Sequence, residues 1–275
     1  MQAIYLLNEN PIFYGMFSIS VRLLKKYNPN IEIKLFYIQD KGQDSWKETR
    51  RIQSLIDPEE AKKYLITNKE QLVDLCKKLN IEIEYCENLG LNQNYTPLHR
   101  HYLKNISSEN CLLLDVDTFI LKEIDFSDYK DFDFVAHPMM SFSVDKVEMT
   151  KWIFNYFNNG LKKVFMSPFN SGVVFWNNGW IKKYGEQVLE YCNKLKYKKH
   201  PMSSTMYTLR EDGRNREEVA CTLFVLENDL KWTYFNFQHV QTFNLKGETS
   251  IFHTTSIAWP HYFNFFAKQG SFTSI

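Results

Sequence analysis

The sequence predicts an α/β fold, a single domain with a mainly parallel central sheet flanked by helices. Short apolar runs alternate with segments of helical spacing through the first half of the chain, which is typical of βαβ units. The chain has 275 residues, of which 44% are hydrophobic, so it can bury one large core. No internal repeat, low-complexity tract or linker interrupts it. We therefore expect one domain over residues 1–275, with halves at about 1–120 and 121–275.

The first half of the chain supplies most of the predicted sheet. Residues 31–38 alternate between polar and apolar side chains, as a half-buried strand does, and the helical pattern before them stops ahead of Pro29. Ligands of parallel sheets bind at the carboxyl ends of the strands, so the residues that follow each strand are the first candidates for a site. The predicted strands are 3–7, 31–38, 81–86, 111–115 and 133–137, and the predicted helices are 17–27, 43–55, 68–80 and 97–106.

The second half has a less regular pattern. Residues 163–177 are expected to hold two strands, separated by a break at Ser167 and Pro168. The helix predicted at 216–228 begins with two acidic residues, which suits the dipole at a helix N-terminus. The remaining expectations are a helix at 180–195, a polar loop at 200–215, and late strands at 231–237 and 250–253.

The overall composition excludes several classes of protein. A net charge of +1 provides no field that would attract nucleic acid. No apolar stretch is long enough to span a membrane, and the first residues lack the basic and apolar regions of a signal peptide. The five cysteines are odd in number, irregularly spaced and without a CxxC pair, which favours reduced thiols and a cytoplasmic location.

Two carboxylates end the apolar run at residues 111–114. Asp115 and Asp117 are two positions apart, and such side chains on a strand point the same way. Mg²⁺ and Mn²⁺ prefer oxygen ligands and often share a site between carboxylates and substrate phosphates. The pattern therefore fits a metal site for a nucleoside diphosphate derivative, and it equally fits a pair of solvated acids in a turn.

Several motifs in this chain together resemble a known enzyme class. The segment LLLDVDTFIL followed by FNSGVVFWN resembles the GT-A glycosyltransferases of the nucleotide-diphospho-sugar transferase superfamily, especially the glycogenin-like and lipopolysaccharide galactosyltransferase-like members. The motifs IYLLNEN, REEVACTL and IFHTTS stand in the same order, and the similarity covers most of residues 3–256. The resemblance implies a GT-A-type, Rossmann-like domain, in which residues 1–120 bind the nucleotide and residues 121–275 bind the sugar and acceptor.

The resemblance also implies a set of functional residues. It implies a metal site at Asp115, Asp117 and His253, and a shell of two carboxylates and one imidazole favours Mn²⁺ over Mg²⁺. It implies catalytic roles for Arg100, beside the diphosphate, and for Glu217 and Glu218, beside the transferred sugar. The implied donor-binding residues are Asn8, Glu9, Asn10, Arg100, Asp115, Val116, Asp117, Asn170 and Ser171.

Taken singly, these residues also have purely structural interpretations. His253 can be an ordinary core or surface histidine, and Arg100 can be a surface residue of a helix, although its guanidinium fork suits phosphate oxygens. The two glutamates can be helix-start acids. The asparagines at 8 and 10 can end a strand, and the Asn-Ser-Gly segment at 170–172 can be a turn. Aromatic residues with two interpretations, as core residues or as platforms for a base or sugar ring, are Tyr14, Trp176, Trp180 and Trp259.

The chain also departs from the pattern of the family. Glycogenin-like proteins follow the late histidine with a glycine and a phosphate-binding lysine, and neither is present here. Replacements for that lysine are expected among Thr254, Thr255, Ser256, Arg100 and Lys268. The acidic position reads Glu-Glu where retaining members commonly have Asp-Gln, which leaves open whether the anomeric configuration is retained or inverted.

The function predicted from the sequence is metal-dependent glycosyl transfer. The expected enzyme is of the hexosyltransferase type and moves a sugar from a nucleotide-sugar donor, a UDP-sugar, to a hydroxyl of a glycan, protein or small molecule. One alternative is a phosphatase of the haloacid dehalogenase type, although Phe119 stands where that motif has Thr or Val. A second alternative is a non-catalytic nucleotide-sugar-binding protein on the same scaffold.

Overall fold

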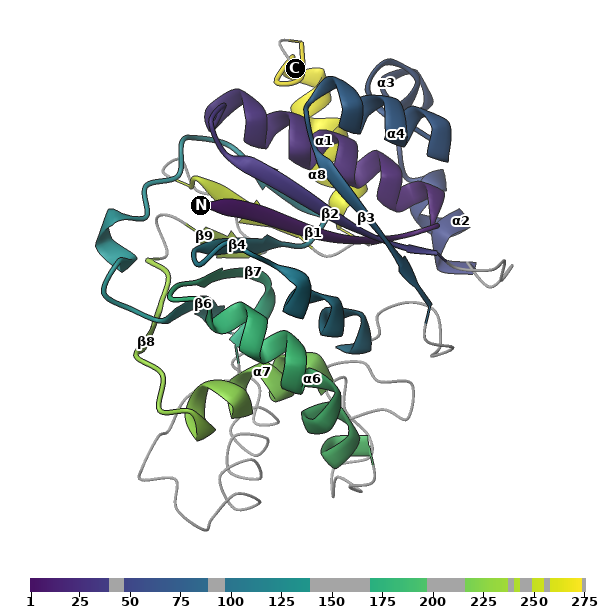
Figure 1. The fold of residues 1–275 in the computed structure, drawn as a ribbon. Helices are drawn as coiled ribbons and strands as arrows, with labels where there is room; N and C mark the ends of the chain where they lie inside the picture. Colours follow the sequence, from purple (N-terminus) through teal and green to yellow (C-terminus); the bar gives the residue numbers. More distant parts are fainter. Residues whose placement is uncertain are drawn as a thin grey trace, which may run out of the picture. The chain divides into compact units, whose positions relative to one another are not determined.

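The described part of the chain forms two compact units. The computed structural model describes residues 1–39, 47–88, 97–138, 169–196, 216–236, 240–242, 249–254 and 258–273 (Figure 1). The first unit comprises Met1–Asn88, Leu112–Phe126 and Asn236–Ile275, and the second comprises Leu89–Cys111 and Ser127–Phe235. Each unit therefore combines segments that are distant in the sequence.

The first unit is built on a parallel sheet. Its strands β1 (Gln2–Asn8), β2 (Glu32–Gln39), β3 (Glu82–Glu87) and β4 (Cys111–Leu114) lie in the order β3-β2-β1-β4. β2 is parallel to both β1 and β3. The apolar side chains of β1, β2 and β4 are almost all buried, as expected for strands covered on both faces.

A smaller sheet in the first unit places a late segment of the chain beside the end of β4. It contains β5 (Thr118–Ile120), β9 (Val240–Thr242) and β10 (Ile251–His253), in the order β5-β10-β9. β10 is antiparallel to β5 and parallel to β9. Since only three residues separate β4 from β5, this pairing brings β10 next to the end of β4.

Five helices lie among the described residues of the first unit. Their bounds are α1 (Pro11–Tyr27), α2 (Lys47–Ser54), α3 (Pro58–Tyr64), α4 (Lys69–Lys78) and α8 (Trp259–Lys268). α1 contacts β1 and α4, and Figure 1 shows these two helices beside each other over the strands. α3 and α4 are capped by the side chains of Asp57 and Asn68, which accept hydrogen bonds from backbone N–H groups of the first turn.

The start of α1 differs from the sequence prediction. The helical pattern predicted a start at residue 17, whereas α1 begins at Pro11. The Asn10 side chain accepts a hydrogen bond from the backbone N–H of Ile12, and Pro11 occupies the first helical position, where its missing N–H costs nothing. The prediction was wrong because it followed hydrophobic spacing and ignored the capping residues.

A row of stacked aromatic rings packs against β5, the strand that follows the turn after β4. Phe119 of β5 stacks on Trp259 of α8 with ring centroids 5.7 Å apart. Trp259 in turn stacks on Phe263, and Phe263 on Phe272. All four side chains are buried, so the aromatic residues of the C-terminal segment serve the core of this unit.

The second unit also combines strands and helices. Its strands β6 (Phe134–Pro138), β7 (Phe169–Trp176) and β8 (Trp232–Tyr234) lie in the order β7-β6-β8. β6 pairs antiparallel with β7, with an irregularity between Ala136 and His137, and parallel with β8. The helical segments are η1 (Pro97–Asn105), η2 (Ser127–Tyr129), α6 (Trp180–Lys196) and α7 (Arg216–Glu227).

Close packing of α6 on η1 depends on a glycine. A Cβ atom built on Gly185 would lie 2.3 Å from the backbone nitrogen of Lys104 and 2.7 Å from the carbonyl carbon of Leu103. Since both neighbours are backbone atoms, no side-chain rotation could relieve the clash. Gly185 therefore fixes the distance between α6 and η1, the segment that carries Arg100.

The predicted fold class is confirmed. The described pairings of β1, β2, β3, β6 and β8 are parallel, β6–β7 is antiparallel, and helices pack on the strands of both units. β5, β9, η2, α3 and α8 were not predicted. The first strand expected within 163–177, the break at 167–168 and the loop expected at 200–215 lie outside the described residues.

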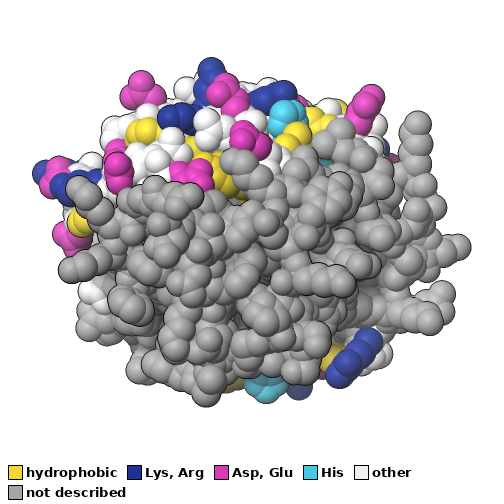
Figure 2. All heavy atoms as spheres, turned by 90° about the horizontal axis from the view of Figure 1, so that it is seen from below, with side chains coloured by type: hydrophobic (Ala, Val, Ile, Leu, Met, Phe, Trp, Pro, Cys, Tyr) yellow, Lys and Arg dark blue, Asp and Glu magenta, His cyan; other side chains and the backbone are white. Residues whose placement is uncertain are grey.

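The described surface matches the nearly neutral composition. Figure 2 shows acidic and basic side chains interspersed on the described part of one face. Among the helices that the structure describes, none has the length and apolar character required to cross a bilayer.

Three described cysteines are expected to resist modification in the folded protein. Cys76, Cys86 and Cys111 are buried thiols. Burial raises the pKa of Cys76 and of Cys86 to about 12, and that of Cys111 to about 11, so each stays in the unreactive protonated form near neutral pH. Alkylation by iodoacetamide, mapped by mass spectrometry, should be roughly 10-fold or more slower in the native than in the denatured chain. Equal rates in the two states would contradict the burial of these thiols.

Candidate functional site

The turn that follows β4 carries the two acidic residues singled out in the sequence. Asp115 follows the last residue of β4, and Asp117 precedes the first residue of β5. Val116 between them is buried, and so is Asp117. The buried CLLL strand thus delivers both acids to the carboxyl edge of the parallel sheet, where ligands of such sheets bind.

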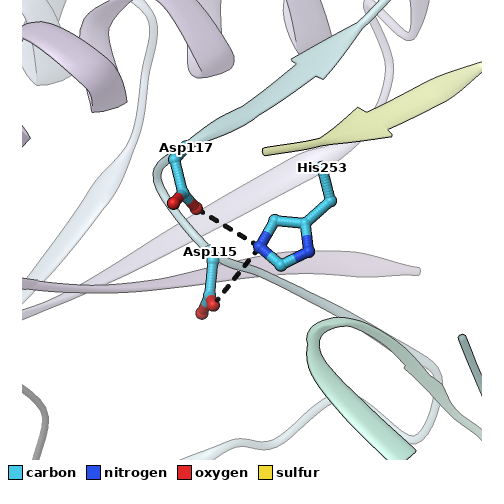
Figure 3. Close-up of side chains that lie close together, drawn as sticks. All are labelled: Asp115, Asp117 and His253. Carbon is cyan, nitrogen blue, oxygen red and sulfur yellow. Dashed lines mark ion pairs between the residues drawn. The ribbon is translucent and has the colours of Figure 1, made fainter. Parts of the chain in front are cut away.

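The third predicted ligand comes from a distant part of the sequence. His253 is the last residue of β10 and lies opposite Thr118 in the β5–β10 pairing. Its Nε2 atom is 3.7 Å from Asp115 Oδ2 and 3.4 Å from Asp117 Oδ1. Figure 3 shows the two carboxylates directed toward the same imidazole nitrogen.

The three side chains form a group that could hold a divalent cation. Their potential ligand atoms all lie within 4.8 Å of one another, and their side chains are only 10–16% exposed. The Oδ1 atom of Asp117 is buried and has no hydrogen-bond partner among the described residues. Burying two carboxylates side by side is costly unless a positive charge lies between them, so this donor set fits a cation.

The oxygen-rich composition of the group also limits which metal it suits. Carboxylate oxygens suit Mg²⁺ and Mn²⁺, and the imidazole of His253 suits Mn²⁺ better than Mg²⁺. The residues predicted as ligands are therefore brought together in the folded chain. Their coordination of a particular metal stays a prediction.

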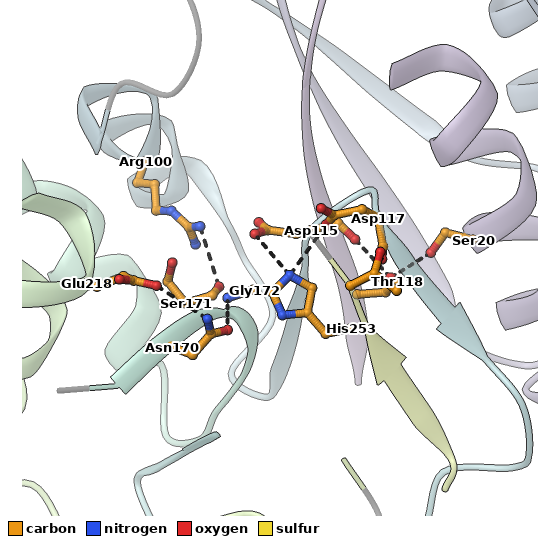
Figure 4. A network of polar contacts seen from close by, with 11 residues as sticks. Ser20, Arg100, Asp115, Asp117, Thr118, Asn170, Ser171, Gly172, Glu218 and His253 are labelled. Atoms are coloured by element: carbon orange, nitrogen blue, oxygen red, sulfur yellow. Dashed lines mark hydrogen bonds and ion pairs between the residues drawn. The ribbon is translucent and has the colours of Figure 1, made fainter. Parts of the chain in front are cut away.

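A second group of predicted residues meets within the second unit. Arg100 of η1 is buried, and its Nη2 atom lies 3.5 Å from the backbone oxygen of Ser171 in β7. The Asn170 side chain donates to Glu218 Oε1 at 3.4 Å and accepts from the backbone N–H of Gly172 at 3.0 Å. Figure 4 shows these contacts, which join η1, β7 and the first turn of α7.

This second group combines a cation, an amide and a carboxylate. Arg100 offers guanidinium donors that suit phosphate or sugar oxygens, and Glu218 offers an acceptor that suits a sugar hydroxyl. The first residues of β7 are therefore part of a polar cluster rather than a plain turn. The side chain of Glu217 lies outside the described part, although its backbone belongs to α7.

The three residues after β1 have definite local contacts. The backbone N–H of Asn10 donates to Asn8 Oδ1 at 3.2 Å, and the Asn10 side chain caps α1. Glu9 accepts a hydrogen bond from Tyr37 at 3.4 Å and lies 3.7 Å from the ammonium of Lys69. The asparagines thus shape the loop that enters α1, and their predicted contact with a nucleotide stays a prediction.

No sequence motif indicated Tyr37 and Lys69, which contact Glu9, or Tyr85, which lies beside Lys69. The Lys69 ammonium lies 4.9 Å from the ring centre of Tyr37 and 5.6 Å from that of Tyr85. Tyr37 and Tyr85 are direct partners in the β2–β3 register, and Tyr85 is half exposed. Aligning the carboxyl ends of the predicted strands would have found both tyrosines, because parallel strands end at the same edge.

The candidates for phosphate contact have different positions. The Thr254 backbone N–H and hydroxyl both donate to the backbone oxygen of Asp117, at 3.1 and 2.9 Å. The Nζ atom of Lys268 is 3.9 Å from Asp57 on the exposed side of α8. Thr255 and Ser256 lie outside the described residues.

Two of the four aromatic candidates belong to the core. Trp176 and Trp259 are completely buried, so neither is available as a platform for a ligand ring. Tyr14 is buried and shares a hydrogen bond of 2.7 Å with Tyr37. Trp180 is half-buried at the start of α6, beneath the ammonium of Lys183.

Comparisons with known proteins identify the fold. No family model and no curated protein matches this chain. The galactosyltransferase LgtC in complex with donor and acceptor sugar analogs is similar over 98% of this chain and 96% of its own, with a TM-score of 0.54 and 12% identity. An active-site mutant of LgtC gives a TM-score of 0.53 and 13% identity over the same shares.

A third solved structure has the same character. The apo structure of the bifunctional glycosyltransferase WbbM is similar over 92% of this chain and 45% of its own, with a TM-score of 0.50 and 10% identity. At such identities the comparisons establish the fold: the chain has the GT-A-type fold found in these glycosyltransferases.

Proposed function

Starting from this shared fold, we propose that the protein is a metal-dependent glycosyltransferase that uses a nucleotide-sugar donor. The observation that carries the proposal is the group formed by Asp115, Asp117 and His253 at the carboxyl end of β4. Two carboxylates and an imidazole, nearly buried and within 4.8 Å of one another, suit a divalent cation that also binds phosphate oxygens. A UDP-sugar is the donor we propose.

The metal-binding group would assist the reaction by stabilising the nucleoside diphosphate as it leaves the sugar. When bound, Mn²⁺ or Mg²⁺ supplies positive charge that stabilises the diphosphate as a leaving group. Asp115, Asp117 and His253 are the residues that would hold the cation. Because the three side chains are mostly shielded from water, their interactions with charge are stronger than they would be in solution.

The residues of the second unit would act on the sugar and the diphosphate. We assign the guanidinium of Arg100 to the charge that develops on the diphosphate, and Asn170 and Ser171 to the sugar hydroxyls. Glu218, with Glu217 before it, would orient the sugar in a retaining reaction or deprotonate the acceptor hydroxyl in an inverting one. Determining the anomeric configuration of the product decides between these two roles.

The remaining parts of the proposal concern the organisation of the chain and its partners. Residues 1–120, with Asn8, Glu9 and Asn10, would supply the nucleotide-binding half, and residues 121–275 the half that binds sugar and acceptor. The acceptor is a hydroxyl group on a glycan, a protein or a small molecule. Buried cysteine thiols support a reducing, cytoplasmic environment.

Ligand-dependent thermal stabilisation and donor turnover test the proposal together. A panel of nucleotide sugars, each with and without Mn²⁺, should raise the melting temperature above the value with Mn²⁺ alone only for the cognate donor plus metal, by an amount that increases with ligand concentration. The same combination should release the nucleoside diphosphate slowly by donor hydrolysis. Absence of any shift and any hydrolysis across the panel would refute the proposed function.

The experiment also separates the two alternative functions. A non-catalytic binding protein would be stabilised by a nucleotide sugar without releasing the diphosphate. A phosphatase would instead release inorganic phosphate from simple phosphate monoesters.

A further inference from the structure

We propose that a buried chain of three hydroxyl groups, on Tyr5, Ser20 and Thr118, positions the Asp115–Asp117 turn for metal binding. This inference rests on the proposed metal site and adds positioning residues that lie outside the ligand group. The three residues come from β1, α1 and β5, so the chain of hydroxyl groups joins three elements of the first unit.

The contacts between these residues are short and shielded from water. The Tyr5 hydroxyl is 2.9 Å from Ser20 Oγ, and Ser20 Oγ is 2.8 Å from Thr118 Oγ1. Thr118 Oγ1 then donates to the backbone oxygen of Asp115 at 2.8 Å. All three side chains are completely buried, and Figure 4 shows Ser20 directed toward Thr118.

The carbonyl group at one end fixes the direction of every hydrogen bond. A carbonyl oxygen can only accept, so the single hydroxyl hydrogen of Thr118 is used on Asp115. Thr118 must then accept from Ser20, and Ser20 must accept from Tyr5. Burial raises the pKa of Tyr5, so this terminal donor keeps its proton.

Thr118 occupies a central position among the metal-binding residues. It follows Asp117 directly, its hydroxyl bonds to Asp115, and it lies opposite His253 in the β5–β10 register. Thr254, the residue after β10, donates two hydrogen bonds to the backbone oxygen of Asp117. The turn is therefore anchored at both aspartates through backbone carbonyl groups.

The hydroxyl chain costs more to bury than apolar side chains of similar size would. Buried polar groups stabilise a fold only when they are fully satisfied, and their directional bonds then specify one arrangement of the backbone. Outer groups that orient metal ligands typically change metal affinity about 10- to 100-fold when they are removed. The same magnitude is expected here, because the hydroxyl chain holds the backbone from which two ligands project.

Titration of the full chain with Mn²⁺ alone tests this inference, with binding followed by calorimetry and by the electron paramagnetic resonance signal of free Mn²⁺. Ser20→Ala and Thr118→Val should weaken Mn²⁺ binding about 10- to 100-fold. Thr118→Ser keeps the hydroxyl and should restore affinity to within roughly threefold of the wild type.

A neighbouring serine provides a matched control. Ser18 is also completely buried in α1, but its hydroxyl donates to the backbone oxygen of Gly15 in the same helix. Ser18→Ala removes a buried hydroxyl of the same kind without touching the chain to Asp115, so Mn²⁺ affinity should stay within about threefold. Equal weakening by Ser18→Ala and Ser20→Ala would show a general packing effect and overturn the inference.

The outcomes distinguish this inference from the proposed function. If the wild-type protein binds no Mn²⁺, the proposed metal site itself fails. If the wild type binds Mn²⁺ and folded Ser20→Ala binds it equally tightly, only the positioning role is wrong. Should Ser20→Ala fail to fold, Tyr5→Phe removes the terminal donor and keeps the buried ring; unchanged Mn²⁺ affinity in that variant would likewise overturn the inference.

Discussion

Asp117→Ala is expected to abolish the stabilisation of this protein by a nucleotide sugar and Mn²⁺ and to lower donor turnover by about three orders of magnitude. The substitution removes the carboxylate whose Oδ1 lies 3.4 Å from His253 Nε2. A bound metal contributes several kcal/mol to the stabilisation of developing charge, and each 1.36 kcal/mol corresponds to tenfold in rate. Release of nucleoside diphosphate, measured with Mn²⁺ in excess, gives the rate.

An exposed aspartate of the same unit controls for the loss of charge. Asp74 lies on the solvent-exposed face of α4, and Asp74→Ala should leave turnover within about twofold. Without metal, circular dichroism should show the same secondary structure in both variants and the wild type. Full Mn²⁺-dependent turnover in correctly folded Asp117→Ala would contradict the role assigned to this carboxylate.

Trp176→Ala is expected to destabilise the protein strongly, more than most single substitutions in the second unit. The Trp176 ring is completely buried, stacks on Tyr184 at 5.3 Å and meets Phe134 edge-on at 4.6 Å. Removing a buried tryptophan ring from such a core costs about 3–5 kcal/mol. The melting temperature of a chain of this size should fall by roughly 10 °C, as measured by thermal unfolding.

Two further variants separate packing from any role in ligand binding. The Trp176 indole N–H has no hydrogen-bond partner among the described residues, so Trp176→Phe removes an unsatisfied donor and should cost much less than the alanine variant. Trp180 is half-buried at the start of α6. Its substitution by alanine should lower the free energy of unfolding by only about 1 kcal/mol. A strong loss of donor binding in stable Trp176→Phe would contradict the assignment of this ring to the core.

Much of the fold could be predicted because the signals are local. The apolar runs of β1, β2 and β4 and the spacing of α4 and α6 record which side chains face the core, and this requires only neighbouring residues. α8 was not predicted; five of its ten residues are Trp, Tyr or Phe, and its polar residues are the isolated His261, Asn264 and Lys268. The early start of α1 depends on one cap at Asn10 rather than on hydrophobic spacing.

The candidate site was partly predictable for the same reason. The two aspartates at positions 115 and 117 lie two positions apart in the sequence, and their position after a buried strand is a local signal. Glu9, by contrast, was singled out without its neighbours Tyr37 and Lys69, which come from other elements. For Trp176 and Trp259 the interpretation as core residues is confirmed, although composition alone cannot distinguish a core tryptophan from one at a binding surface.

The residue pattern alone was enough to predict the alternation of strands and helices and the position of two carboxylates at the end of a buried strand. The resemblance implied that His253 joins them; the folded chain shows its Nε2 beside both carboxylates and links Ser20 to Thr118 through hydroxyl groups 98 positions apart. The physical reason is that secondary structure follows from side-chain periodicity over a few residues. The joining of β10 to β5, in contrast, depends on hydrogen bonding and packing between segments that meet only when the whole unit folds.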